Sequence, residues 1–407
     1  MSDKASRHYV AVIFILAFAI RIAYAIVAPP FQAPDEYSHF SYAKYVHDAH
    51  QLPVQQNPAV NPEELEYHQP PLYYVLAASL IPSTSLITAK PLLPLRFINI
   101  LFSMLTVGVV YYFASSVVRW NQFSVALVCA IFSLLPTYSY LSATVRNGTL
   151  AVFFASLGFY LCTKAVLDGQ QHGVRWAMIG AVAGLAILSK LSAAGFVFAT
   201  GVTIVATSPD WSASLRRAGW FGIGVMSTAG WWFVRNAIVY GRAFAIVENG
   251  YDFGRAPLSW DHEKRSAITI FKTFWAVFGR INEHYFPDIY RFYWWFTGLA
   301  VLGIVVRYVW YRRRDWSDLP QKVVSFFVLA IGASLLATMY YAHNYDSDQG
   351  RYMFPVLIPI TTFIVIGLNT LIPERYQRFA LDVVLFGFAG INTLVLARLA
   401  AVYWQIG

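Results

Sequence analysis

The sequence predicts an all-α protein that crosses a membrane many times, about eleven times by the segments below. Hydrophobic residues make up 57% of the 407 residues and charged residues only 13%, whereas about a quarter of an ordinary soluble domain is charged. Several stretches approach or exceed the roughly 20 apolar residues that cross a hydrocarbon core ~30 Å thick. We therefore expect a single integral membrane domain over residues 1–407, without a soluble domain.

Charge and cysteine usage exclude two other classes. The net charge of +9 requires no nucleic acid, because basic residues at the cytoplasmic ends of membrane helices explain it. Cys129 and Cys162 both fall inside apolar segments, so no disulfide framework is expected.

The first half of the chain predicts four long helices and one short one. Residues 9–28 form a retained signal-anchor helix, because no small-residue cleavage site follows them. The apolar stretch 71–81 would span about 17 Å at 1.5 Å per residue, too little to cross a bilayer, so it should lie at the interface. Membrane helices are expected over 94–118, 123–141 and 149–167.

The second half begins with two short apolar halves in 176–208. They are split at Ser189-Lys190-Leu191-Ser192, because a lysine is costly in the middle of a bilayer. An aromatic stretch covers 271–286. Further helices are expected over 218–234, 290–310, 323–340, 353–371 and 379–397.

Three polar loops, 30–70, 239–290 and 341–352, are expected on one outer face. The short loops between the other helix ends carry the arginine clusters, whereas most acidic residues fall in the three long loops. By the positive-inside rule, the arginine-rich side is cytoplasmic. We therefore expect a multi-pass protein of the cytoplasmic (inner) membrane, with its active site on the extracytoplasmic side.

The first loop concentrates the residues that could perform chemistry. Pro34-Asp35-Glu36 and His39 open it, and His68-Gln69-Pro70-Pro71 closes it. Pro34 predicts a short helix immediately behind it, and in the simplest interpretation Asp35 and Glu36 only stabilise the dipole of that helix. A carboxylate beside a cavity at membrane level can instead act as a general base. His39, His47 and His50 fit solvated loop positions.

Three basic residues at helix ends, Lys190, Arg235 and Arg351, would suit a phosphate, which arginine can hold with a bidentate fork. Each also has a simpler interpretation. Either arginine could be an interfacial side chain that snorkels, Arg351 could pair with Asp346 or Asp348, and Lys190 could only bound a helix hairpin. No tight ligand spacing supports a metal, although a divalent ion around Glu36 and His68 stays an option.

These motifs resemble the GT-C superfamily of membrane glycosyltransferases, and a bacterial branch of it most closely. The specific ones are Pro34-Asp35-Glu36 with His39-Phe40, His68 to Tyr74, and Gln349-Gly350-Arg351-Tyr352 with Pro355. Weaker matches are Leu188-Ser189-Lys190, Trp231-Trp232 with Arg235-Asn236, Tyr240-Gly241, and Phe274-Trp275 with Phe278-Gly279. The resemblance covers residues 10–360 in order.

Two departures stand out. Asn147-Gly148 occurs where relatives often have Asn-Asp, and Gly241-Arg242-Ala243 replaces a common Gly-Asp-Pro. The missing acid in the second outer loop weakens a metal-dependent version of the mechanism, so we expect neither a metal nor another cofactor.

The resemblance implies a hexosyl- or pentosyltransferase that uses a polyprenyl-phosphate sugar and an extracytoplasmic lipid, glycan or protein acceptor. It implies Asp35 as the catalytic acidic residue, and we predict its neighbour Glu36 to be catalytic as well. If attack is direct, the anomeric carbon inverts. The other candidate residues are Arg351, Lys190 and Arg235 for the donor phosphate, and His39, His68, Gln69 and Tyr352 for substrate.

Two other functions stay open. A polysaccharide polymerase or ligase would use a diphosphate-linked lipid donor and the same cationic face, without an acid pair at the start of the first loop. A lipid or sugar transporter would place its ionisable groups near the middle of the membrane.

Overall fold

The computed structural model describes residues 3–56, 61–81, 92–169, 172–244, 259–279, 287–310, 319–345 and 347–404. These residues form helices and no strands, which confirms the all-α class. Seven of their helices are long and apolar enough to cross a membrane, and three further apolar helices are shorter. The expected number of about eleven crossings is therefore not confirmed.

The first membrane helices lie where the sequence predicts them. They are α1 (Asp3–Val27), α4 (Leu93–Tyr112), which continues as a π-helical turn, and α7 (Gly148–Leu167). The expected helix over 123–141 is instead broken into α5 (Gln122–Leu134) and α6 (Pro136–Leu141). Pro136 cannot donate a backbone hydrogen bond and disfavours the helical conformation of the residue before it, so the break falls there.

The second half follows the prediction except around 218–234, where the chain forms α10 (Trp211–Val225) and α11 (Trp231–Tyr240), joined by a π-helical turn. Two apolar helices, α8 (Gly173–Ser189) and α9 (Ala194–Thr207), are separated at Lys190 as expected. The remaining helices are α12 (Trp260–Trp275), α13 (Pro287–Trp310), α14 (Gln321–Tyr345), α15 (Leu357–Leu371) and α16 (Gln377–Trp404). The Arg312-Arg313-Arg314 cluster and Asp346 lie outside the described residues.

Glycines let two helix pairs pack backbone to backbone. A Cβ atom at Gly303 of α13 would lie 1.9 Å from the carbonyl oxygen of Gly367 in α15. One at Gly180 of α8 would lie 2.0 Å from the carbonyl oxygen of Phe221 in α10. Contacts between small residues are how membrane helices associate in the absence of a hydrophobic driving force.

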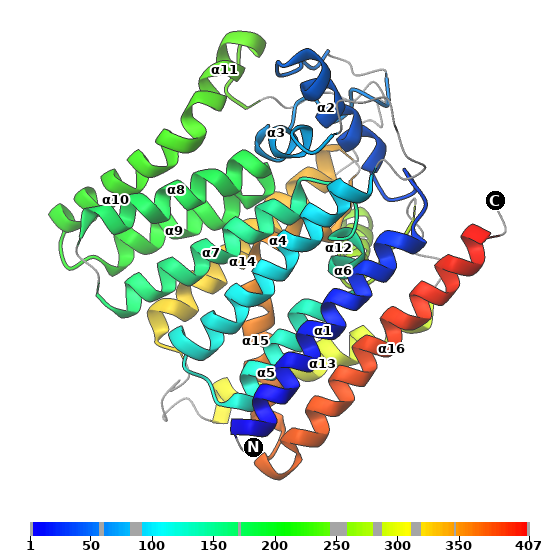
Figure 1. Cartoon of the computed structure of the whole chain (residues 1–407). Helices are drawn as coiled ribbons and strands as arrows, with labels where there is room; N and C mark the ends of the chain where they lie inside the picture. The colour runs from blue at the N-terminus through cyan, green and yellow to red at the C-terminus, as the bar shows by residue number, and fades with distance from the viewer. Residues whose placement is uncertain are drawn as a thin grey trace.

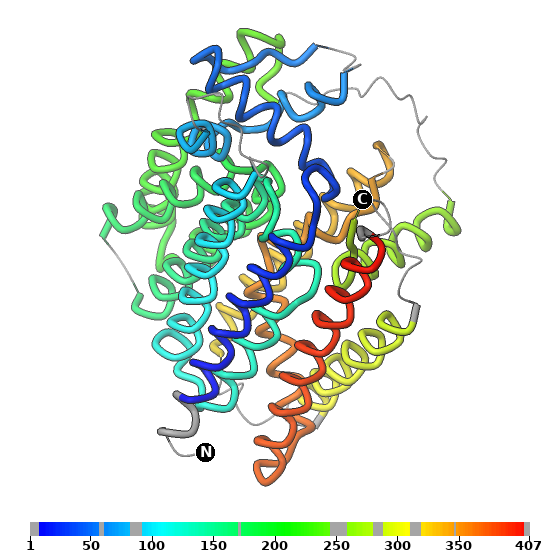
Figure 2. Tube along the Cα trace, turned by 45° about the vertical axis from the view of Figure 1, so that its right-hand side comes forward, coloured from blue at the N-terminus to red at the C-terminus, as the bar shows by residue number. Residues whose placement is uncertain are grey.

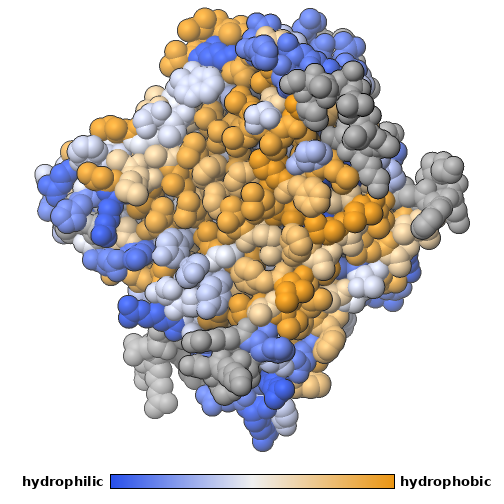
Figure 3. All heavy atoms as spheres, in the orientation of Figure 1, coloured by the Kyte–Doolittle hydropathy of each residue, from blue (hydrophilic) through white to orange (hydrophobic). Residues whose placement is uncertain are grey.

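The helices form a bundle in which α1 packs beside α16 and α5, while α8, α9 and α10 gather at one side (Figure 1, Figure 2). In the same orientation, apolar side chains cover the middle of the visible face, and hydrophilic residues gather toward its upper and lower ends (Figure 3). This pattern suits a bundle whose middle lies in hydrocarbon.

Two short helices of the first loop cover the end of the bundle opposite the start of α1 (Figure 1). They are α2 (Glu36–Ala49) and α3 (Leu72–Ala78), the latter only seven residues long, as expected for an interfacial helix. The rings of Tyr42 and Tyr74 stack between them with centroids 3.7 Å apart.

The first and second loops meet at this end. Arg235 Nη2 donates to the carbonyl oxygen of Pro53 at 2.7 Å, and the hydroxyl of Tyr240 accepts from the backbone N–H of Gln55 at 3.0 Å. The third loop joins them through an ion pair between Arg351 and Asp35. The described parts of the three polar loops therefore share one end, as the sequence predicts.

Candidate active site

Asp35 stands at the entrance of the site, at the N-terminal end of α2. Its φ of 61° lies in the left-handed region, which non-glycine residues seldom adopt and which is common at functional sites. Its carboxylate pairs with Arg351, yet the side chain of Asp35 stays 38% exposed. Burial alone would raise the pKa of Asp35, but the charge of Arg351, followed by that of Arg146, holds it well below its usual range. Asp35 is therefore ionised at neutral pH.

Glu36 has a different environment from its neighbour. Its fully buried carboxylate accepts from Arg96 Nε at 2.9 Å and Nη2 at 2.8 Å. The backbone N–H groups of Val145 and Phe31 donate to it at 3.0 Å each. These bonds join the first loop to α4 and to the segment before α7, so the geometry makes Glu36 a residue that positions Asp35.

Replacing Glu36 by alanine should lower the free energy of unfolding by about 3–5 kcal/mol, because the buried charge of Arg96 would lose its carboxylate partner. The measurement is denaturant unfolding of the detergent-solubilised protein. Glu374→Ala is the control, since Glu374 is exposed and its loss should change stability by less than about 0.5 kcal/mol. Equal stability of the two variants would contradict the positioning role.

His39 and Glu66 lie beside Asp35, and ligand atoms of the three side chains are within 4.8 Å of one another. His39 is fully buried and not solvated, and its Nδ1 lies 2.8 Å from the hydroxyl of Tyr74. Burial lowers the pKa of His39 well below its ordinary value, so the ring is neutral. Burial, followed by the charge of Asp35, raises the pKa of Glu66 to about 7.

A pocket next to this acidic cluster collects three cationic side chains, those of Arg146, Lys190 and Arg351. Gly148 and Thr149, the first residues of α7, also line it, and a helix N-terminus favours an anion. The rest of the lining is formed by Tyr138, Leu141, Ser142, Val152, Ser192, Phe354 and Pro355. The pocket encloses only about 20 Å³, about the space of one water molecule, and its cationic lining favours a small anionic group.

The cations of this pocket carry unused hydrogen-bond donors. Arg146 is 3% exposed, and its Nη1 and Nη2 are buried without a partner among the described residues. Nε and Nη1 of Arg351 are likewise unpartnered within the described part of the chain. Burial, then the charge of Arg351, lowers the pKa of Arg146 to about 10, so it stays cationic. Unsatisfied buried donors are rare and costly, so they point to an acceptor that binds there.

Lys190 completes the cationic set. Its Nζ lies 3.4 Å from Oδ1 of Asn147 and 5.7 Å from the ring centroid of Tyr352. Burial, together with Arg351 and Arg146, lowers the pKa of Lys190 to about 7. A bound anion would favour its charged form.

The other predicted site residues lie at different distances from the pocket. Gln69 does not line it; its Oε1 accepts from Nδ2 of Asn147 at 3.3 Å, and Asn147 in turn contacts Lys190. His68 is adjacent, and burial lowers its pKa to about 4. Tyr352 sits between Lys190 and Arg351. Arg235 does not line the pocket; it stacks on Trp232, 4.9 Å from the ring centroid.

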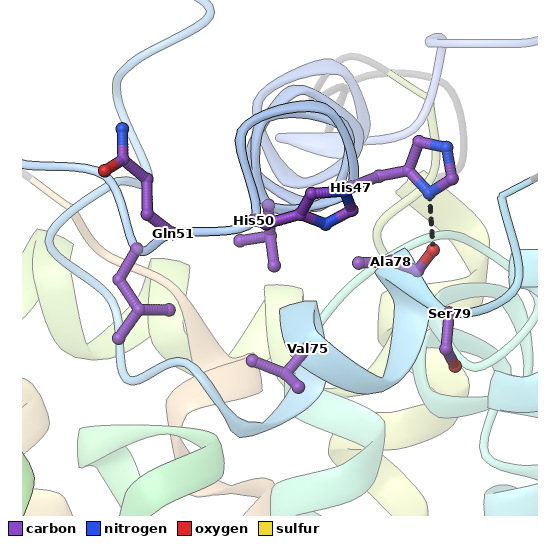
Figure 4. Close-up of a pocket in the computed structure, with 8 residues that line it drawn as sticks. His47, His50, Gln51, Val75, Ala78 and Ser79 are labelled. Carbon is purple, nitrogen blue, oxygen red and sulfur yellow. Dashed lines mark hydrogen bonds between the residues drawn. The ribbon is translucent and has the colours of Figure 1, made fainter. Parts of the chain in front are cut away.

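A second pocket of about 440 Å³ opens between α2 and α3. Figure 4 shows His47 and His50 on one side of it and Val75, Ala78 and Ser79 on the other, with His47 bonded to the carbonyl oxygen of Ala78 at 3.1 Å. No carboxylate or lysine or arginine side chain is among its lining residues, which distinguishes it from the cluster around Asp35.

Sequence reasoning missed Arg146 and Glu66 as site residues. The signal for Arg146 was present, because it directly precedes Asn147-Gly148, where an expected acid is replaced. Glu66 is one of several acids in the loop, and it differs from the exposed Glu63 in being half-buried and in lying beside Asp35 and His39.

Several known proteins resemble this chain. A family profile described as dolichyl-phosphate-mannose-protein mannosyltransferase matches residues 68–232. No curated protein matches by sequence. The crystal structure of ArnT from Cupriavidus metallidurans bound to undecaprenyl phosphate is similar with a TM-score of 0.57, 14% identity, and coverage of 99% of this chain and 75% of that one.

An archaeal structure is similar as well. AglB, an oligosaccharyltransferase from Archaeoglobus fulgidus in complex with an inhibitory peptide and a dolichol-phosphate, has a TM-score of 0.52 and 14% identity. The match covers 98% of this chain and 55% of AglB, so this chain spans about half the length of the archaeal protein.

Proposed function

We propose that this chain, which has the GT-C fold of ArnT and AglB, is a glycosyltransferase that uses a polyprenyl-phosphate-linked sugar. The single observation that carries the proposal is the pocket lined by Arg146, Lys190 and Arg351, which lies directly beside Asp35. Guanidinium N–H groups of both arginines have no hydrogen-bond partner among the described residues. Those three cations suit a phosphate, and the polyprenyl chain of the donor would lie outside this small pocket.

In the proposed reaction, Asp35 removes the proton from an acceptor hydroxyl. The acceptor oxygen attacks the anomeric carbon while the bond from that carbon to the phosphate oxygen breaks, and direct attack inverts the configuration. The leaving group is a phosphate that departs with the electron pair and needs no proton. Cationic side chains that stabilise its charge therefore contribute more than a general acid would.

The proposed reaction uses no metal. Asp35, His39 and Glu66 offer suitable ligand atoms, but the charges of Arg351, Arg146 and Lys190 act on the same two carboxyl groups. A cation would meet this positive field, whereas an anionic phosphate is attracted by it. The residues present therefore favour the phosphate over a divalent ion.

The arginine-rich short loops of the sequence support a site on the extracytoplasmic side of the cytoplasmic membrane. The acceptor would be a lipid, glycan or protein hydroxyl that reaches Asp35 from outside. The donor would enter the pocket from the bilayer, and the sugar would be a hexose or a pentose.

The proposal is tested by binding, without turnover. Undecaprenyl phosphate should raise the melting temperature of the purified protein, since a ligand at about 100 times its Kd adds about 2.7 kcal/mol of stability. Undecaprenol, which has the same chain and no phosphate, should give a much smaller shift. Equal shifts with the two lipids would contradict a phosphate site and with it the proposed donor.

A further inference from the structure

A second group of metal-ligating side chains lies where α12 meets the end of α14. His262 and Glu263 belong to the first turn of α12, and His343 to the last turns of α14. One ligand atom from each of the three lies within 4.8 Å of the other two. This group shares no residue with the cluster of Asp35, His39 and Glu66, and the proposed sugar transfer does not use it.

The spacing of these atoms resembles that of ligands around one ion. Nδ1 of His343 lies 3.1 Å from Oε1 of Glu263. Two ligands of a tetrahedral zinc, each about 2.0–2.2 Å from the metal, lie about 3.3–3.5 Å apart. The rings of His262 and His343 have centroids 6.1 Å apart at 75°. Small rotations of side chains would bring all three groups onto one centre.

His262 supplies the independent observation. Its Nε2 is buried and has no hydrogen-bond partner among the described residues. An ion pair between Glu263 and His343 would account for the contact of those two side chains. It would not account for the buried, unpartnered Nε2 of His262. A metal would use the lone pair of His262 and would account for all three.

We propose that His262, Glu263 and His343 bind a divalent transition metal, with zinc as the best match. Two imidazoles and one carboxylate are a recurrent zinc set that leaves a fourth position for water. Imidazole ligands also disfavour magnesium and calcium, which prefer oxygen. This site goes beyond the proposed transferase function and does not depend on it.

The metal would link α12, the helix against which the third loop packs, to α14. A Cβ atom at Gly350 would lie 2.2 Å from the carbonyl oxygen of Ile270 in α12, and the N–H of Gly350 donates to Oγ1 of Thr273 at 2.8 Å. Arg351 follows directly. An ion that joins α12 to α14 would therefore restrict the segment that carries Arg351.

The test uses the full-length protein without a polyhistidine tag, stripped with a chelator and titrated with zinc. Zinc should raise its melting temperature, and equilibrium dialysis should show a tight site. His262→Gln should fold normally, because no hydrogen bond of the described chain is lost. It should weaken zinc binding by at least about 100-fold, since even partners of ligands cost 10–100-fold when removed. Glu263→Gln should act likewise.

His8→Gln is the matched control, because His8 is an exposed histidine of α1 and should leave zinc binding unchanged. Asp35→Asn should also keep the zinc-induced shift. Equal zinc affinity of His262→Gln and the parent would overturn the proposal. Loss of the shift in Asp35→Asn alone would overturn it too, because the ion would then belong to the other cluster.

Discussion

Asp35→Asn should lower the rate of sugar transfer by about 10²–10⁴-fold, the usual contribution of a general base. An amide of the same size cannot accept the proton of the acceptor hydroxyl. The variant also releases Arg351 from its ion pair, so affinity for undecaprenyl phosphate should stay the same or increase. The readouts are turnover with a polyprenyl-phosphate sugar and lipid binding by melting temperature.

Asp48→Asn is the matched control for this experiment. Asp48 lies in the same helix, α2, but its side chain is 53% exposed and pairs only with Lys44. Its replacement should leave turnover close to that of the parent. Near-normal turnover of Asp35→Asn would remove Asp35 from the mechanism and direct attention to Glu66, whose pKa of about 7 also suits a base.

Arg146→Ala should weaken the binding of undecaprenyl phosphate by about 10–100-fold, since a hydrogen bond to a charged group contributes about 1.5–3 kcal/mol. The stability of the protein without lipid should not fall, because both Nη atoms of Arg146 lack a partner among the described residues. Weaker lipid binding together with unchanged stability would identify Arg146 as a ligand-binding residue. Both are measured by thermal unfolding at increasing lipid concentration.

Arg235→Ala makes the informative comparison, because the sequence assigns the same role to Arg235. In the structure its guanidinium bonds to the carbonyl oxygen of Pro53 and stacks on Trp232. Its loss should lower stability and leave lipid affinity nearly unchanged. If Arg235→Ala weakened lipid binding more than Arg146→Ala did, the phosphate would have to lie outside the pocket described above.

Composition and local pattern predicted much of the fold. Apolar length placed the long helices, and the polar run around Lys190 correctly divided α8 from α9. Such signals are local, so they survive without knowledge of tertiary contacts. Pro136 also indicates the break between α5 and α6. The apolar stretch around it is long enough for one membrane helix, however, and that length favours a continuous helix over 123–141.

The sequence indicated the acidic residues of the candidate site, Asp35 and Glu36, but not the side chains with which each of them pairs. Asp35 and Glu36 are neighbours with the same charge, yet Glu36 begins α2 whereas Asp35 precedes the helix in a left-handed backbone conformation. Glu36 contacts Arg96, sixty positions on, and Asp35 contacts Arg351, over three hundred positions on. Pairings across such separations depend on how the helices pack, which no local pattern encodes.

The ion pair between Asp35 and Arg351 would couple donor binding to acceptor activation in the proposed reaction. While Arg351 faces Asp35, it holds the carboxylate in a weakly basic form. A donor phosphate that draws Arg351 away removes this restraint, and the proton affinity of Asp35 rises. In the proposed reaction, Asp35 would then activate the acceptor only after the sugar donor has bound. The ion pair between Asp35 and Arg351 would thus set the order in which the two substrates react.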